Sequence, residues 1–430
     1  MLLAAAHQSR FTLATASGVQ QVYLLLRLLH TLAASFIWGI NTLFLLDAGL
    51  NNAQAFGANA FFTAGMVVFE VPTGVVADTR GRRLSYLLGT STLAASTMLY
   101  LAMWYSSAPF WAWALASALL GLGFTFFSGA VEAWLVDALT HTGYFRNGGT
   151  LERVLAKGKI VEGAAMLGGS VTGGLIAQAS NLGVPYVLRT LVLIVTFGLA
   201  YALMRDTGFT PSRDKRLIEE VRSIVRASIA HGLGNPPVRW IMLEAPFTGG
   251  VTIYAFYAMQ PYLLELWGNE RAFAIAGLAA AIVAGAQIAG GLLVPRLGRV
   301  FRRRTSILLA GTGLGTGVLA VIGLAPGFWI AIVLLVAWGL VFAAEMPVRQ
   351  AYLNALIESR ERATVLSFDS LLGSSGAVAT QPFLGRAADA WGYPASYILS
   401  AGVQALSIPF LWLARREDAA ADVIDLSKRG

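Results

Sequence analysis

The sequence predicts an all-α membrane protein in which twelve transmembrane helices form two pseudo-symmetric halves of six. Three observations lead to this fold class. First, 56% of the 430 residues are hydrophobic and only 13% are charged, about half the charged fraction of an average soluble protein. Second, the apolar residues gather in long segments. Third, a pattern in the first half of the chain returns in the second half.

Each apolar segment is long enough to cross a bilayer, which takes about 20 mostly apolar residues. The 46 glycines are compatible with this interpretation, since small residues let membrane helices approach closely. The twelve predicted helices cover residues 22-48, 53-78, 84-106, 109-139, 153-180, 183-205, 239-266, 270-298, 304-325, 327-356, 363-390 and 393-414.

The repeated pattern relates the two halves of the chain. Residues 74–83 read GVVADTRGRR, and residues 291–300, which lie 217 positions later, read GLLVPRLGRV. Residues 133–139 and 350–356 resemble each other at the same offset. A half-chain period of membrane helices is typical of transporters built from two related halves.

The net charge of +8 indicates a membrane topology and not a nucleic-acid partner. Most of the 31 Lys and Arg residues lie in alternate loops, including 79–83, 205–239 and 296–304, whereas the loops between these are nearly free of basic residues. By the positive-inside rule, both termini and the central connector are cytoplasmic. We therefore expect an integral protein of the plasma membrane, the inner membrane in a bacterium.

Several functional classes are excluded by what the sequence lacks. It has no cysteine and only four unclustered histidines, so we expect no disulfide, metal site or cofactor. It has no phosphate-binding loop, no HExxH and no triad motif, so we do not expect an enzyme. Residues 1–21 lack a basic start followed by a long apolar core, so no cleavable signal is predicted. We expect a monomer.

The chain is predicted to contain two helical domains and a linker. The first domain covers residues 1-205, the cytoplasmic linker 206-238, and the second domain with its tail 239-430. Within the linker, the apolar residues of 213–229 follow the spacing of one helical face, with basic residues opposite. Such a helix lies on the membrane surface against anionic lipid. It either connects the halves, which we favour, or binds a regulatory partner.

The sequence resembles the major facilitator superfamily of secondary transporters over its whole length. The signature of that family, in the loop after the second helix, reads approximately G-x-L-A-D-R-x-G-R-K. Val76 and Thr79 depart from it. The matching residues are Gly74, Ala77, Asp78, Gly81, Arg82 and Arg83. The resemblance implies the major facilitator fold but not a substrate, because carriers of sugars, drugs and anions share this signature.

The resemblance also implies a conformational latch at the signature loop. In the family, an aspartate–arginine–aspartate cluster is thought to hold the two halves together in the outward-open form. An arginine at the membrane edge is costly without partners, which favours a latch over a charge cluster that only anchors a tight loop. The predicted latch residues are Asp78, Arg82, Asp137, Gly74 and Gly81.

Ionisable residues inside the predicted helices are functional candidates, because each is costly in lipid unless it is paired or hydrated. All of them fall in the cytoplasmic half of their helices. Low dielectric and nearby like charges favour the neutral form of a carboxyl group, as a proton-coupling site requires. The candidates are Arg27, His30, Glu70, Glu132, Glu244, Glu345, Arg349 and Asp369.

Glu132 and Arg349 occupy equivalent positions in the two repeats, 217 residues apart. They form either an ion pair that closes the inner side until Glu132 is protonated, or a fixed salt bridge. Glu345, four residues before Arg349, competes as a partner within the helix. Our preferred proton carrier is Glu132, followed by Glu70 and Asp369.

The fifth helix contains a glycine motif with two interpretations. Residues 169–174 read GSVTGG, which resembles the G-P-x-x-G-G of proton-coupled exporters with Ser170 in place of the proline. The motif indicates either antiport or close packing of helices through small residues.

The predicted substrate cavity combines aromatic, amide and basic side chains. Such a lining suits an amphipathic organic solute, although aromatic residues also face lipid or the membrane interface. The predicted lining residues are Arg27, His30, Trp38, Asn41, Tyr254, Tyr257, Gln260, Gln287 and Gln381.

These observations predict a secondary transporter that works by alternating access and exports amphipathic, multidrug-like compounds in exchange for protons. Its expected partners are a small-molecule substrate, protons and membrane lipid. An alternative is uptake or facilitated uniport of a small anionic solute bound by Arg27 and Arg349. An alternative from another class is a membrane receptor that does not transport.

Overall fold

The computed structural model describes residues 13, 15–127, 129–211, 221, 222, 226 and 228–424, and most of these are helical. The predicted amphipathic linker helix lies largely outside the described residues. The first half comprises α2 (Ala16–Trp38), α3 (Asn41–Asp47), α4 (Asn52–Arg80), α5 (Arg82–Ser106), α6 (Phe110–Thr125), α7 (Ala130–His141), α8 (Leu151–Ala179) and α9 (Gly183–Leu203). The second half comprises η1 (Ser228–Leu233), α11 (Pro236–Trp267), α12 (Phe273–Gly290), η2 (Gly291–Leu293), α13 (Val294–Val300), α14 (Arg304–Ile322), α15 (Phe328–Leu356), α16 (Arg362–Ala405), α17 (Ile408–Arg416) and η3 (Ala420–Asp422).

Ten segments of the described chain are long and apolar enough to cross a membrane, whereas the sequence predicts twelve. One of the ten, Thr364–Arg416, has 53 residues, more than twice what one pass requires. Its helix breaks at Gly392, where φ is +81°. Ser396 then donates a hydrogen bond to the carbonyl of Leu384 at 3.0 Å, so the chain reverses and makes two passes. This hairpin and the 32-residue helix α11, which is not among the ten, account for the difference.

Two of the predicted continuous helices are interrupted. The segment predicted over 22-48 divides into α2 and α3 at Gly39 and Ile40. The segment predicted over 109-139 divides into α6 and α7, and α7 starts after Gly129 in the left-handed region. Such breaks leave backbone groups that need partners from neighbouring helices.

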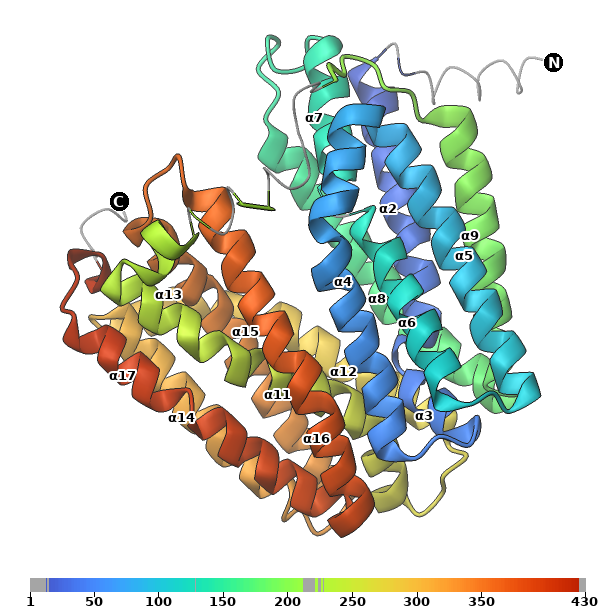
Figure 1. The fold of residues 1–430 in the computed structure, drawn as a ribbon, viewed down its shortest axis with the longest axis vertical. Coiled ribbons are helices and arrows are strands. Elements are labelled where there is room, and N and C mark those ends of the chain that lie inside the picture. Colours follow the sequence, from blue (N-terminus) through green and yellow to red (C-terminus); the bar gives the residue numbers. More distant parts are fainter. Residues whose placement is uncertain are drawn as a thin grey trace.

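Exposed tryptophans agree with a membrane environment. Trp111, Trp329 and Trp391 are 69%, 70% and 69% exposed, and all three lie where a helix begins or turns at the same end of the molecule. Tryptophan is enriched at membrane–water interfaces because its ring is apolar and its N–H is polar. We call this the distal end, and the opposite end, where α2 begins and α17 ends, the terminal end (Figure 1).

The two halves meet at the distal end and diverge toward the terminal end (Figure 1). Helix α4 packs on α16 and α8 on α12 across the boundary. Among the described residues, the hydrogen bonds that join the halves lie toward the distal end. The structure is therefore closed at the distal end.

Glycines permit the close approach of α8 and α12. A Cβ added to Gly277 would lie 2.5 Å from the carbonyl oxygen of Ser170 and 2.9 Å from the Cα of Gly174. A Cβ on Gly173 would lie 2.0 Å from the carbonyl oxygen of Phe36 in α2. The glycine motif of the fifth predicted helix thus packs helices together, and this contact supports the second of its two interpretations.

Gly174→Val is expected to hold the distal end apart. Its side chain would meet Phe273 and Gly277 of the opposite half, and overpacking of this kind costs about 1–3 kcal/mol. We expect the ratio of distal-closed to distal-open molecules to fall by about 5- to 150-fold, seen as longer distances between spin labels on the two halves. Gly168→Val in the same helix, where nothing lies within 4 Å, is the control, and equal distances in both variants would contradict the prediction.

Candidate functional site

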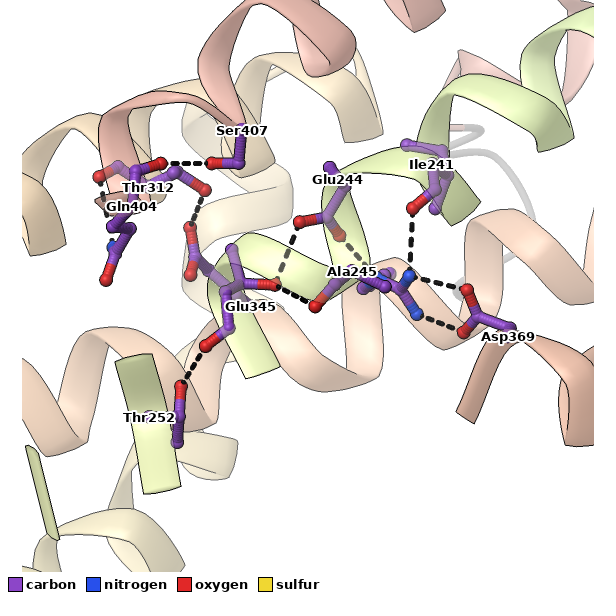
Figure 2. Close-up of polar contacts among 11 residues, drawn as sticks. Ile241, Glu244, Ala245, Thr252, Thr312, Glu345, Asp369, Gln404 and Ser407 are labelled. Atoms are coloured by element: carbon purple, nitrogen blue, oxygen red, sulfur yellow. Dashed lines mark hydrogen bonds and ion pairs between the residues drawn. The ribbon is translucent and has the colours of Figure 1, made fainter. Parts of the chain in front are cut away.

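A buried ionic network occupies the interior of the second half (Figure 2). Its centre is the Arg349 guanidinium of α15. Nε lies 2.6 Å from Oε1 of Glu244 on α11. Nη1 and Nη2 lie 2.6 and 2.8 Å from the two carboxylate oxygens of Asp369 on α16. Nη2 also donates to the carbonyl of Ile241 at 3.0 Å. Arg349 therefore links three helices, with bidentate geometry toward Asp369.

Glu244 is held from two sides. It is 3% exposed, its Oε1 faces Arg349, and its Oε2 accepts a hydrogen bond from Thr248 Oγ1 at 3.0 Å. Thr248 lies one helical turn later on the same face of α11, so the local helix positions this donor. Both oxygens of Glu244 are thus occupied.

Glu345 lies one turn before Arg349 on α15 but does not pair with it, contrary to the predicted competition. Glu345 Oε1 accepts a hydrogen bond from Thr312 Oγ1 of α14 at 3.1 Å. A Cβ on Gly311 would lie 2.2 Å from the same oxygen, so the glycine makes room for the carboxyl group. Among the described residues, no basic side chain lies within ion-pair distance of Glu345.

The network of the second half has an excess of acid. When all groups are ionised, the network contains three carboxylates and one guanidinium. Two of them, Glu244 and Asp369, share Arg349, and the third, Glu345, has only a hydroxyl partner. An unpaired carboxylate is expensive in lipid, so this position can hold a proton or attract a cation.

The first half contains a balanced network. Arg27 of α2 lies 3.1 Å from Glu132 Oε1 and also pairs with Glu162 of α8. Lys159 Nζ contacts the other oxygen of Glu162 at 3.0 Å. The break in the fourth predicted helix places Glu132 in the first turn of α7, where a negative charge is favoured by the helix dipole.

The predicted pair between Glu132 and Arg349 is not formed in this structure. Each residue is neutralised within its own half, Glu132 by Arg27 and Arg349 by two carboxylates. Glu162, the second partner of Arg27, was not among the predicted residues. The sequence does contain a signal for Glu162 as a charged group inside a helix, because it lies three residues after Lys159 in the fifth predicted helix.

Of the remaining intramembrane candidates, His30 lies in an aromatic environment. The His30 ring packs against Phe124 and Phe127, with centroid distances of 5.8 and 4.2 Å, and its Nδ1 has no hydrogen-bond partner among the described residues. Glu70 is partly buried on α4, two residues before Pro72. In the described part of the chain, no group of three or more His, Asp or Glu residues is arranged to hold a metal ion.

The signature loop at the terminal end is held within its own half. Arg82 pairs with Asp78 and lies over the Phe209 ring at 5.6 Å. Arg82 and Asp137, both described, do not form a direct ion pair in this structure. Asp206, which follows α9, accepts a hydrogen bond from the backbone N–H of Arg83 at 2.8 Å. Asp206 was not among the predicted residues.

The second half contains a contact equivalent to that between Asp206 and Arg83, and we call both contacts clamps. Asp422, which follows α17, accepts hydrogen bonds from the backbone N–H and the hydroxyl of Thr305 at 2.7 Å each. Thr305 is the second residue of α14, as Arg83 is the second residue of α5. In both halves an aspartate after the last helix thus caps the third predicted helix, so the two clamps share the repeat symmetry even though Pro295 replaces Asp78.

Two of the predicted cavity residues, Gln260 and Tyr257, contact the break between α2 and α3, and a third, Trp38, is the last residue before it. Gln260 of α11 is fully buried; its Oε1 accepts from the N–H of Thr42 at 2.9 Å and its Nε2 donates to the carbonyl of Trp38 at 2.8 Å. The Tyr257 carbonyl accepts from Thr42 Oγ1 at 3.0 Å. The two Gln260 contacts satisfy backbone groups that the break exposes, and all three hydrogen bonds join the two halves.

Three of the other predicted cavity residues are buried and do not line an open cavity in this structure. Asn41 is buried and bonds to Asn59 and Tyr186, at 3.0 Å each. Tyr254 and Gln381 are fully buried, and Gln287 is partly exposed. The buried amides therefore hold helices together in this conformation.

The comparisons with known proteins agree on one family. The profile described as Major Facilitator Superfamily matches residues 23–320 and, in a second match, residues 254–428. No curated protein sequence matches this chain significantly.

Solved structures share the fold at low sequence identity. A bacterial homologue of the human lysosomal transporter Spinster, in an inward-facing and unoccupied conformation, superposes with a TM-score of 0.73 at 15% identity, covering 95% of this chain and 98% of that one. The nucleoside transporter NupG gives 0.72 at 10% identity, covering 92% and 98%. A D-xylose–proton symporter gives 0.64 at 15% identity, covering 92% and 96%.

Proposed function

Because the chain belongs to the Major Facilitator Superfamily, whose members are transporters, we propose that it is a proton-coupled exporter of amphipathic organic compounds that works by alternating access. The observation that carries proton coupling is Glu345, a carboxyl inside the second half with a hydroxyl partner but no basic one among the described residues. This proposal replaces Glu132 as the preferred proton carrier, since Glu132 is paired with Arg27.

The orientation in the membrane is part of the proposal. The basic loops at 79–83 and 296–304 both lie at the terminal end, so the positive-inside rule makes this end cytoplasmic. The structure, closed at the distal end, is then the inward-facing state of a plasma-membrane protein. The signature latch of Asp78, Arg82 and Asp137 would engage the second half only after the terminal end closes.

The uniport of a small anion would need Arg27 and Arg349 to bind the solute. Both arginines are already paired with carboxylates, so we do not favour this alternative. Arg27 contacts Glu132 and Glu162, and Arg349 contacts Glu244 and Asp369. A solute anion would have to displace a carboxylate from either guanidinium, which leaves a buried charge unpaired. We therefore favour a neutral or cationic amphipathic substrate.

Glu345→Gln tests the proposal in proteoliposomes. With one coupled proton, a gradient of one pH unit supports about tenfold substrate accumulation. We expect the parent protein to concentrate a fluorescent lipophilic cation against its gradient and to release protons in exchange. Glu345→Gln should lose accumulation and pH dependence while retaining downhill exchange, because the amide keeps the shape of the site without a titrating group.

Two controls separate the alternatives. Glu265→Gln changes an exposed carboxylate at the distal end of α11 and should behave as the parent. Glu132→Gln should keep its pH profile; loss of coupling there and not in Glu345→Gln would return the proton to Glu132. Substrate binding without flux in the parent would support a receptor and overturn transport.

A further inference from the structure

We propose that Asp389 is a gating residue that holds the distal end closed by capping a helix of the opposite half. Asp389 lies on α16 in the second half. Its Oδ1 accepts a hydrogen bond from the N–H of Asn52, and its Oδ2 accepts one from the N–H of Ala53, both at 2.9 Å. These two amides are the first of α4, in the first half.

The chemistry of a helix start explains why this contact is strong. The first amides of a helix have no acceptor within the helix, and the helix dipole gives them partial positive charge. Asn51 caps α4 by accepting from the N–H of Gln54 at 2.9 Å, which leaves the amides of Asn52 and Ala53 to an outside acceptor. The carboxylate supplies one oxygen to each, and both hydrogen bonds are charge-assisted.

Neighbouring contacts show that the halves are fitted together around this carboxylate. A Cβ on Gly385, one turn before Asp389, would lie 2.7 Å from the carbonyl oxygen of Asn52 and 2.9 Å from Phe56. The Tyr393 hydroxyl bonds to the side chain of Asn52. The distal end cannot open while Asp389 stays bound, because α4 and α16 belong to different halves.

The position of Asp389 at the outer end of its helix would by itself suggest an ordinary hydrated carboxylate and not a gate. An aspartate at the outer end of a helix is reached by water and has no need of a partner. Here both of its oxygens are committed to the other half. Asp389 would therefore stabilise the distal-closed state, as the predicted latch at Arg82 stabilises the terminal-closed state.

The absence of cysteine from the sequence makes the test direct. One pair of cysteines at Ser106 and Glu270, exposed at the distal end of each half, reports opening there after spin labelling. A second pair at Asn147 and Arg360 reports closure at the terminal end. Distance distributions in nanodiscs then give the ratio of the two states without substrate or proton gradient.

Asp389→Asn should raise the ratio of distal-open to distal-closed molecules by about tenfold or more, the equivalent of one charge-assisted hydrogen bond. Asparagine replaces one of the two accepting oxygens by an NH2 group, which would face the N–H of Asn52 or Ala53 in place of an acceptor. The distal distance should lengthen and the terminal distance should shorten. An unchanged ratio would overturn the proposal.

Three further variants make the result specific. Asn52→Pro removes one backbone donor from the other side, together with the side-chain oxygen that accepts from the Tyr393 hydroxyl. Proline suits the first helical position, and Asn51 already has the extended backbone that precedes proline (ψ 173°). Asn52→Pro should shift the ratio in the same direction, and by more than its matched control Asn52→Ala, which loses the side-chain oxygen but keeps the N–H that Asp389 binds. Asp47→Asn alters a distal carboxylate that accepts from Trp104 Nε1 within the first half, and it should not shift the ratio. An equal shift in Asp47→Asn would show a general charge effect and also overturn the proposal.

The proposal rests on the alternating access of the proposed function, but not on its substrate or on its proton. If Glu345→Gln leaves coupling intact while Asp389→Asn shifts the distances, only the proton assignment fails. If the reverse holds, only the gate fails.

Discussion

Arg349→Met is expected to destabilise the second half more than any other single substitution in the ionic networks. The variant leaves Glu244 and Asp369 without their cation, and Glu244 is almost fully buried. Removing one member of a buried ion pair costs about 3–5 kcal/mol, a large part of the 5–15 kcal/mol that stabilises a typical domain. We expect a lower melting temperature in detergent and loss of transport.

The partners of Arg349 offer a rescue. Combining Arg349→Met with Glu244→Gln and Asp369→Asn removes all three charges and should recover much of the melting temperature, because the cost arises from stranded carboxylates and not from lost packing. Arg349→Lys should be intermediate, since a lysine cannot make the bidentate contact with Asp369. A melting temperature of Arg349→Met equal to that of the parent would contradict this account.

The sequence identified the charged residues inside the helices but not their pairing. Arg27, Glu132, Arg349 and Asp369 were found because any charge in an apolar segment stands out. Their partners depend on how each helix is rotated and on where it breaks, and neither follows from hydropathy. The repeat symmetry suggested Glu132 with Arg349, whereas local packing pairs each of them inside its own half.

The amides were harder to interpret because a membrane interior can use them in two ways. Gln260 has the polarity of a cavity residue, yet it satisfies the backbone at the break after Trp38. This break was not predicted, since Gly39 stands alone in an apolar run and isolated glycines are common in membrane helices. Asp206, Asp389 and Asp422 were missed for a related reason: near a helix end an aspartate is ordinary in sequence, and only the structure shows which backbone amides it caps.

The helical membrane fold and the family were predictable because both depend on long-range patterns. Apolar segments and their spacing reflect the bilayer itself. The signature at 74–83 marks the loop between α4 and α5, and the family profile matches the chain twice. The sequence predicts α11 as one segment and the hairpin at Gly392 as two. A test of helix length and mean hydropathy leaves α11 out and counts the hairpin as one span.

Gly81→Ala is expected to disrupt the conformation of the signature loop and thereby to lower stability and transport. Gly74→Ala in the same signature should change neither. Gly81 has φ +111° and ψ 151°, a region that is almost restricted to glycine and costs other residues about 1–3 kcal/mol. In addition, an alanine Cβ would lie 2.3 Å from Oδ2 of Asp206. Around Gly74 nothing lies within 4 Å, and its backbone is helical, where alanine is favoured over glycine.

The expected consequence follows from what Asp206 does. The alanine would push its carboxylate away from the N–H of Arg83 and so uncap the start of α5, which costs about 1 kcal/mol more. We expect Gly81→Ala to lower both the melting temperature and the transport rate, and Gly74→Ala to change neither. Asp206→Ala should reproduce the loss of the cap without the backbone strain, so its defect should be smaller than that of Gly81→Ala. An equal defect in Gly74→Ala would show that the signature acts through helix packing and not through the geometry of its loop.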